Sequence, residues 1–120
     1  MKPSSPEPKQ GEIWDVSLSP TVGVEQAGVR PALVISNDRF NAAENYLHII
    51  VPITGTDRGL EYQLRIKGKE GGLTRNSVLM CDQAKSVSIM RFRQKRGTIS
   101  GETLMAVRQM VGILIDPRAF

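Results

Sequence analysis

Few side chains of this 120-residue sequence have the types and spacing that acid–base, nucleophilic or metal chemistry requires. The lone histidine, His48, lies inside the apolar run YLHIIV, with no second histidine and no cysteine pair to complete a zinc site. The single cysteine, Cys81, has no histidine neighbour, so we expect a structural residue at a half-buried strand position. Acidic residues do not cluster as in a two-metal nuclease, and P-loop, GxSxG and GxGxxG patterns do not occur. The sequence therefore predicts no bound metal and no cofactor.

Arginine, threonine, glutamate and backbone groups remain as candidates for catalysis. Arg30 follows the polar stretch VEQAG and precedes the apolar run PALVIS, so it lies where a surface loop enters a buried strand. Fixed cations and hydrogen-bond donors stabilise a phosphorane-like transition state rather than activate a bound water. A ribonuclease that uses the 2′-hydroxyl of its RNA substrate has this set of groups. On the residues alone, a solvated cation at a strand start is the commoner role for Arg30.

Charge favours a polyanionic partner. The formal net charge is +4, and the stretch MRFRQKR from Met90 to Arg96 contains four cations and no acid. Lysine and arginine release counterions when they bind phosphates, so a basic patch favours nucleic acid as a partner. Such a run is nevertheless most often a solvated face. The run consists of Arg91, Arg93, Lys95 and Arg96.

The chain has the length of one domain, which we place at residues 11–120. Residues 1–10, MKPSSPEPKQ, contain three prolines and no apolar segment, so they indicate a flexible leader rather than a secretory signal. Apolar runs stay well short of the roughly 20 residues of a membrane span. We expect no membrane association and a cytoplasmic location.

The apolar pattern predicts a mainly β domain. Alternation in GEIWDVSLSP places Trp14, Val16 and Leu18 on one buried strand face, and EYQLRIK does the same for Tyr62, Leu64 and Ile66. Further strands are predicted over 30–37, 46–54 and 76–83, with a continuation over 85–92, a loop from 20 to 30 and one helical turn over 38–45. A helix follows from the N-cap Ser100 to Pro117, with an apolar stripe that ends at Leu114. The elements predict a strongly bent antiparallel sheet or partly open barrel with a terminal helix.

The block GEIWDVSLSPTVGVEQAGVRPALVIS, from Gly11 to Ser36, resembles the signature of the MazF/PemK family of toxin endoribonucleases. The resemblance continues in order through VPIT at 51–54, SVLMCDQAKSV at 77–87 and GTISGETLMAVRQMVGILI at 97–115, so it covers nearly all of the chain after residue 10. Two positions depart from the usual pattern: Val24 stands where the family usually has serine, and Lys85 where many members have arginine.

This resemblance implies an SH3-like barrel of the MazF/PemK/CcdB type with a C-terminal helix, and a homodimer with an RNA groove across both subunits. It implies the toxin of a type II toxin-antitoxin system, an mRNA interferase that cleaves single-stranded RNA at specific sequences without metal or ribosome. Attack by the 2′-hydroxyl would leave a 2′,3′-cyclic phosphate and a 5′-hydroxyl. A MazE-like antitoxin, whose acidic segment occupies the RNA groove, is the implied partner.

The same resemblance assigns roles to individual residues. Arg30 and Thr54 match the catalytic positions, with Arg30 as charge stabiliser or proton donor and Thr54 as a phosphate-orienting hydroxyl. Four polar residues are implied to contact RNA: Glu25, Gln26, Gln83 and Lys85. Glu25 could instead pair with a nearby lysine or arginine at the surface, and Gln83 and Lys85 could simply face solvent.

Two other functions stay open at this point. A CcdB-like toxin would share the barrel but poison DNA gyrase through protein contact, and a plain nucleic-acid-binding barrel would have no activity. Arg30 and Thr54 favour the endoribonuclease, because a protein-binding relative has no need of them.

Overall fold

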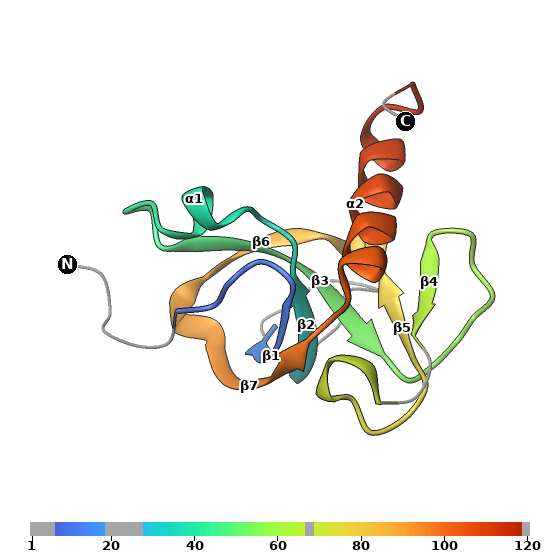
Figure 1. Cartoon of the computed structure of the whole chain (residues 1–120), viewed down its shortest axis with the longest axis horizontal. Coiled ribbons are helices and arrows are strands. Elements are labelled where there is room, and N and C mark those ends of the chain that lie inside the picture. The colour runs from blue at the N-terminus through green and yellow to red at the C-terminus, as the bar shows by residue number, and fades with distance from the viewer. Residues whose placement is uncertain (1–6, 19–27, 67–68, 119–120) are drawn as a thin grey trace.

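A computed structural model describes residues 7–18, 28–66 and 69–118, which form a mainly β domain with one terminal helix (Figure 1). In chain order the strands and helices are β1 (Glu12–Ser17), β2 (Val29–Val34), α1 (Asp38–Asn41), β3 (Leu47–Thr54), β4 (Gln63–Ile66), β5 (Ser77–Met80), β6 (Lys85–Ser88), β7 (Phe92–Thr98) and α2 (Gly101–Ile115). Short 3₁₀ turns η1 (Glu70–Gly72), η2 (Cys81–Gln83) and η3 (Ile89–Arg91) connect the later strands.

The strands form one antiparallel sheet in the order β4-β5-β3-β2-β1-β7, with β6 paired to β3 beside this path. The long strand β3 changes partners along its length. Its first half pairs with β6, its middle with β2, and its last two residues with β5. Because one strand pairs with three partners, the sheet bends around β3. A strongly bent antiparallel sheet is what the sequence predicted.

Both faces of the central strands are buried, each in its own apolar cluster. Ile13, Leu33 and Val51 belong to a first cluster on one face, which helix α2 covers. Their neighbours along the same strands, such as Val16 and Ala32, belong to a second cluster with Phe92. The alternation predicted for β1 is present, but the face opposite Val16 is buried too, since Ile13 is fully inaccessible to solvent.

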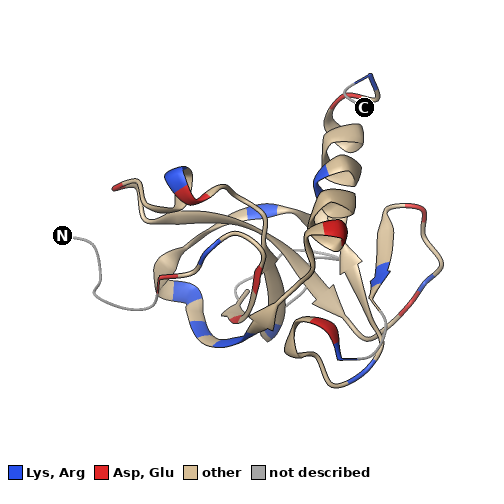
Figure 2. Ribbon diagram, viewed as in Figure 1, with Lys and Arg blue, Asp and Glu red and all other residues tan. Residues whose placement is uncertain are grey.

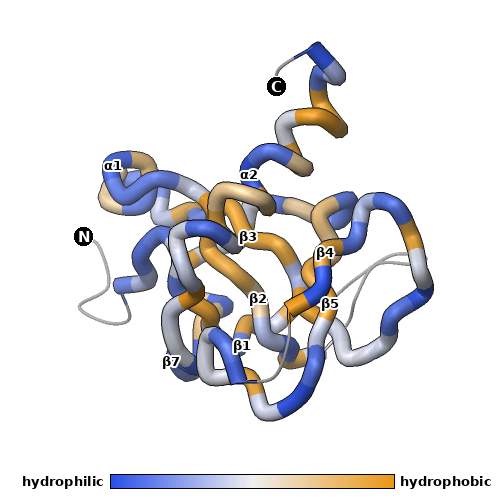
Figure 3. The backbone as a smooth tube through the Cα atoms, turned by 45° about the vertical axis from the view of Figure 1, so that its right-hand side comes forward, coloured by the Kyte–Doolittle hydropathy of each residue, from blue (hydrophilic) through white to orange (hydrophobic). Residues whose placement is uncertain are grey.

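Helix α2 begins as predicted at Ser100, whose hydroxyl accepts a hydrogen bond from the Thr103 backbone N–H. Its first turns pack on the first cluster through the buried Val107 and the partly buried residues Leu104, Met110 and Val111. The helix then projects away from the sheet (Figure 1). Its far end is apolar and exposed (Figure 3), and Ile115 is 81 % accessible.

Three details of the predicted strands are wrong. The pattern placed Cys81 and Gln83 in a strand, whereas both lie in the turn η2. Tyr62 precedes β4 and is exposed, while Gln63 is buried, so the alternation of that strand is offset by one residue at its start. The basic run was predicted as the end of a strand and a patch, but from Phe92 onwards it forms the separate edge strand β7.

Residues at the end of the predicted leader contact the domain. The Gln10 backbone N–H donates to Asp38 Oδ1 at 2.8 Å, and its side chain donates to the Ile35 carbonyl at 2.9 Å. Pro8 is buried, and its carbonyl lies 3.1 Å from His48 Nε2. Among the described residues, no helix combines the length and apolar character that a membrane crossing requires.

Candidate active site

Two adjoining clefts share a common edge formed by Arg30 and Thr54. One cleft has a volume of about 340 Å³ and extends towards Arg58, Gln63 and Gln83. The other has a volume of about 280 Å³ and extends towards other cationic side chains, described below. The two residues predicted as catalytic therefore lie together, at the meeting point of both clefts.

Strand pairing explains why residues so far apart in sequence meet. Strands β2 and β3 are antiparallel, with Ala32 opposite Pro52. Extension of this register by two residues towards the start of β2 brings Arg30 opposite Thr54, the last residue of β3. Pro31, which has no N–H to donate, is accommodated near the strand start. The site thus forms where the loop before β2 and the loop after β3 leave the sheet.

The Thr54 side chain is held by the loop that follows it. The backbone N–H of Thr56 donates to Thr54 Oγ1 at 3.2 Å. A hydroxyl that accepts one hydrogen bond can still donate its own proton, so Thr54 can present an O–H to an anionic oxygen. Arg30 is exposed on β2 and supplies a guanidinium cation with several hydrogen-bond donors.

The second cleft is strongly basic because Arg75 and Arg96 line it together with Arg30. Arg75 lies against Gly55, where a Cβ atom would come within 2.8 Å of the Arg75 Nη2 atom. Glycine at this position therefore allows a guanidinium group to lie beside Thr54. Arg96 is partly neutralised, since its Nε atom lies 3.5 Å from Asp15 Oδ1.

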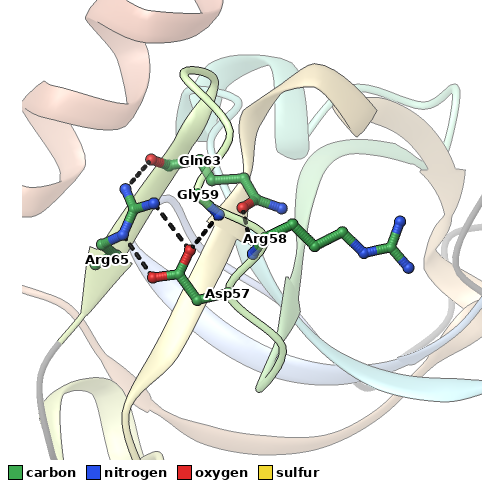
Figure 4. Close-up of polar contacts among 5 residues, drawn as sticks. All are labelled: Asp57, Arg58, Gly59, Gln63 and Arg65. Carbon is green, nitrogen blue, oxygen red and sulfur yellow. Dashed lines mark hydrogen bonds and ion pairs between the residues drawn. The ribbon is translucent and has the colours of Figure 1, made fainter.

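The first cleft combines a cation with amide and carboxylate side chains. Arg58 lines it from the loop after β3, and Gln83 and Asp82 line it from the turn η2. The amide of the buried Gln63 fixes the loop, since its Oε1 atom accepts a hydrogen bond from the Arg58 N–H at 3.3 Å (Figure 4). Amide groups and a guanidinium can read base edges and phosphates of an unpaired strand.

The predicted RNA-contacting residues differ in position. Gln83 lines the first cleft, to which Arg30 and Thr54 also contribute. Lys85 pairs with Ile50 at the start of β6 and lines neither cleft that contains Arg30. Glu25 and Gln26 lie outside the residues that the structure describes.

Sequence reasoning missed Arg58 and Arg75, which line the clefts beside Thr54. A signal for Arg75 existed in Gly55, because glycine directly after a candidate catalytic residue can mark a close approach of another group. For Arg58, the signal was its place in the polar loop GTDRG directly after the predicted catalytic strand.

The basic run forms less of the site than its charge suggested. Figure 2 shows its cations at the end of the turn η3 and along β7, where Lys95 pairs with Glu12 at 2.8 Å and Arg96 with Asp15. Arg91 and Arg93 donate to backbone carbonyls at 3.2 Å and 2.8 Å. Of these four cations, Arg96 alone is among the described residues that line the two clefts.

His48 and Cys81 are core residues. The His48 ring is 1 % accessible and packs edge-on against Phe92, with ring centroids 5.1 Å apart. Burial raises the pKa of the Cys81 thiol to about 12, so the thiol is protonated at neutral pH. Within the described ranges, no group of three or more histidine, cysteine or acidic side chains is arranged to hold a metal ion.

The chain matches one family of known proteins over most of its length. A family model described as the PemK-like, MazF-like toxin of type II toxin-antitoxin systems matches residues 9–115. The chain is 33% identical over 109 residues to the endoribonuclease toxin MazF of Escherichia coli K12, a match that covers 90% of this chain and 94% of that protein. It is also 33% identical over 114 residues to endoribonuclease EndoA of Bacillus subtilis, with coverage of 90% and 97%.

Solved structures share the fold. The crystal structure of MazF from Deinococcus radiodurans superimposes with a TM-score of 0.81 at 26% identity, covering 92% of this chain and 98% of that one. A MazE-MazF crystal structure from the same organism has a TM-score of 0.75 at 21% identity, with coverage of 93% and 98%. The predicted fold class and the predicted family are both confirmed: the chain belongs to the PemK-like, MazF-like toxins of type II toxin-antitoxin systems.

Proposed function

We propose that this endoribonuclease of the MazF/PemK toxin family cleaves single-stranded RNA with the RNA's own 2′-hydroxyl as nucleophile. The observation that carries the proposal is the position of Arg30 and Thr54 at the shared edge of two clefts. A strand of RNA that passes from one cleft to the other would place a phosphate at this edge. Arg30 and Thr54 would then contact the scissile phosphate directly.

Each side chain has a defined role in this mechanism. The 2′-hydroxyl gives up its proton to solvent as its oxygen attacks the adjacent phosphorus, and the bond to the 5′-oxygen breaks. The 5′-oxygen takes up a proton from solvent, so that a 2′,3′-cyclic phosphate and a 5′-hydroxyl result. Arg30 stabilises the negative charge that develops on the phosphate oxygens, because a guanidinium is a poor base but a strong, permanent cation. Thr54 donates a hydrogen bond from its hydroxyl group to a phosphate oxygen and orients the phosphate for in-line attack.

The two clefts would hold the RNA on either side of this phosphate. Arg75 and Arg96 give the second cleft the character of a phosphate-binding channel. Gln83 in the first cleft offers amide groups that can distinguish bases. Sequence preference would therefore arise mainly in the first cleft, and affinity mainly in the second.

The exposed end of α2 supports a homodimer. The side chains of Ile113, Leu114 and Ile115 are 41 %, 40 % and 81 % accessible to solvent. A second subunit packed against this end of the helix would bury that exposed apolar area. A MazE-like antitoxin would bind as a competitor of RNA, because an acidic peptide segment would satisfy the same arginines as a phosphate chain. This partner is supported by the family, whose members are toxins of type II toxin-antitoxin systems.

Incubation of the purified protein with a mixed-sequence single-stranded RNA in EDTA tests the proposal. We expect cleavage at defined sites, with products that carry 2′,3′-cyclic phosphates. A gyrase-poisoning toxin or a passive nucleic-acid-binding barrel would leave the RNA intact. Inhibition of gyrase by the same preparation, with uncut RNA, would contradict the proposal and support the CcdB-like alternative.

A further inference from the structure

The loop between β3 and β4 is fastened to β4 by one two-point ion pair (Figure 4). Arg65 on β4 donates from Nε to Asp57 Oδ2 at 2.6 Å and from Nη2 to Asp57 Oδ1 at 2.8 Å. The same Oδ1 atom accepts the backbone N–H of Gly59 at 2.8 Å. One carboxylate thereby fixes the chain on both sides of Arg58.

Arg58 is held by its backbone and points away from this ion pair. Its N–H donates to the buried Gln63 side chain, while its guanidinium extends in the direction opposite to the Asp57 carboxylate (Figure 4). Arg58 lines the first cleft together with Arg30 and Thr54. Asp57 lines neither of the two clefts that contain Arg30.

The charge of Asp57 is already engaged outside the cleft. The hydrogen bond from Arg65 holds the pKa of this carboxyl below its usual range, so Asp57 is ionised at neutral pH. Because that ion pair is exposed, its contribution to the stability of the fold is small. Its structural consequence is local: it sets the course of the loop and the direction of Arg58.

We propose that Arg58 is a phosphate-binding residue for single-stranded RNA and that Asp57 and Arg65 are positioning residues that aim it into the cleft. This inference rests on the proposed function and adds a second cation to the edge formed by Arg30 and Thr54. Arg58 binds an RNA phosphate next to the scissile one, which fixes the strand in the first cleft. Arginine suits this task because its guanidinium binds phosphate through two parallel hydrogen bonds.

The test uses the full-length protein and an RNA that it cuts. A cleavage site is first mapped on a mixed-sequence single-stranded RNA, and an oligonucleotide spanning that site is made with one deoxynucleotide 5′ of the scissile phosphate. Its dissociation constant is measured at several salt concentrations. A plot of the logarithm of this dissociation constant against the logarithm of the salt concentration gives a slope that reports the number of phosphate contacts. For Arg58→Ala, we expect this slope to be smaller than that of the wild type by about 0.7, the value for one phosphate contact on a single strand. Arg58→Lys should keep most of that slope, because it keeps the charge.

Matched variants separate this role from a general loss of positive charge. Arg39→Ala removes an exposed arginine on α1, away from both clefts, and should leave the slope unchanged. An Arg58→Ala slope equal to that of the wild type would overturn the inference. Thermal melting of each variant checks that the fold is intact.

A double-mutant cycle tests the positioning role. Asp57→Asn should weaken binding several-fold in the wild-type background and have no further effect in the Arg58→Ala background, since it acts through Arg58. Glu44→Gln, which removes an exposed acid elsewhere, controls for the change in net charge. Equal effects of Asp57→Asn in both backgrounds would overturn the positioning role.

The cleavage assay distinguishes this inference from the function on which it rests. A wild-type protein that cuts RNA while Arg58→Ala binds and cuts it equally well refutes the inference alone. A wild-type protein that cuts no RNA refutes the proposed function as well.

Discussion

The guanidinium group of Arg75 lies against the backbone of Gly55, so closely that a Cβ atom at Gly55 would come within 2.8 Å of its Nη2 atom and 2.9 Å of its Cζ atom. Gly55 directly follows Thr54, and both Gly55 and Arg75 line the second cleft. The contact therefore couples the identity of residue 55 to the position of a cation beside the proposed phosphate site.

Gly55→Ala should reduce RNA affinity and cleavage more than it reduces stability. The atoms in conflict with the added methyl group are the far end of a flexible side chain, so Arg75 can move aside without disturbing the sheet. We expect about a tenfold loss in kcat/KM, the loss of one charge-assisted contact, with a nearly unchanged melting temperature. Gly101→Ala is the matched control, because nothing lies within 4 Å of a Cβ atom there. Unchanged cleavage by Gly55→Ala would show that Arg75 does not contact RNA.

Arg30→Ala should lower kcat by about 10²-fold or more, as removal of a preorganised charge stabiliser does in other active sites. Arg30 is exposed on β2 and contributes no buried apolar area, so the melting temperature should stay near that of the wild type. Single-turnover cleavage measures the effect, with Arg39→Ala as a charge-matched control. Full activity of Arg30→Ala would remove Arg30 from the mechanism.

Glu70→Gln should destabilise the fold by about 1 kcal/mol at neutral pH. Glu70 Oε1 accepts hydrogen bonds from the Ser100 N–H, the Ser100 hydroxyl and the Thr103 hydroxyl, and so joins the turn η1 to the start of α2. Partial burial alone would raise the pKa of Glu70, but these hydrogen bonds outweigh burial and lower it below its ordinary value of 4.5.

The pH dependence of this effect has a definite sign. Because folding lowers the pKa of Glu70, the unfolded chain binds the proton more readily, and the stabilisation is complete above pH 4.5. It is lost as the pH falls through the folded-state pKa. Urea unfolding of both proteins should therefore show a difference at pH 7 that shrinks in strong acid. A difference that grows towards low pH would contradict this role.

Ile115→Asp should weaken self-association without unfolding the subunit. Ile115 is 81 % accessible in the single chain, so a charge there costs little in the folded monomer, whereas it would be buried in an apolar interface. Light scattering across a concentration series should show a dimer for the wild type and a larger monomer fraction for the variant. Gln109→Asp places the same charge at an exposed polar position of α2 and is the control. A monomeric wild-type protein at micromolar concentration would contradict the dimer.

The elements that sequence predicted well are those with a strong apolar period. β1, β2 and β3 were found because their buried residues alternate or run together, and α2 because Ser100 and Pro117 bound a helical stripe. The edge strand β7 was not predicted as a separate strand. Phe92 is its sole buried residue in the described structure, so its sequence shows no alternation of apolar and polar residues. The turn η2 escaped because Cys81 is as deeply buried as a strand residue.

The residues of the site also divide into those that a sequence motif predicts and those that only the fold brings into place. Arg30, Thr54 and Gln83 were predicted from the motif that they share with a known family, and the structure brings all three to one cleft. Arg58 and Arg75 were missed because tertiary contacts shape their surroundings: the Asp57–Arg65 pair ties the loop of Arg58 to β4, and the bare backbone of Gly55 admits Arg75. Gly55 after Thr54 and the polar loop GTDRG were the available signals, but neither identifies the tertiary contact that it makes.

The identity of the nucleophile tests the central claim most directly. An RNA oligonucleotide that spans a mapped cleavage site is prepared with one deoxynucleotide immediately 5′ of the scissile phosphate, beside an all-ribose control, and each is incubated with the protein in EDTA and in magnesium. If the 2′-hydroxyl attacks while Arg30 and Thr54 hold the phosphate, the deoxy substrate binds almost normally and stays uncut, and the control is cut equally in both buffers. Cleavage of the deoxy substrate at the usual rate, or loss of control cleavage in EDTA alone, would show that water is the nucleophile and would contradict the mechanism.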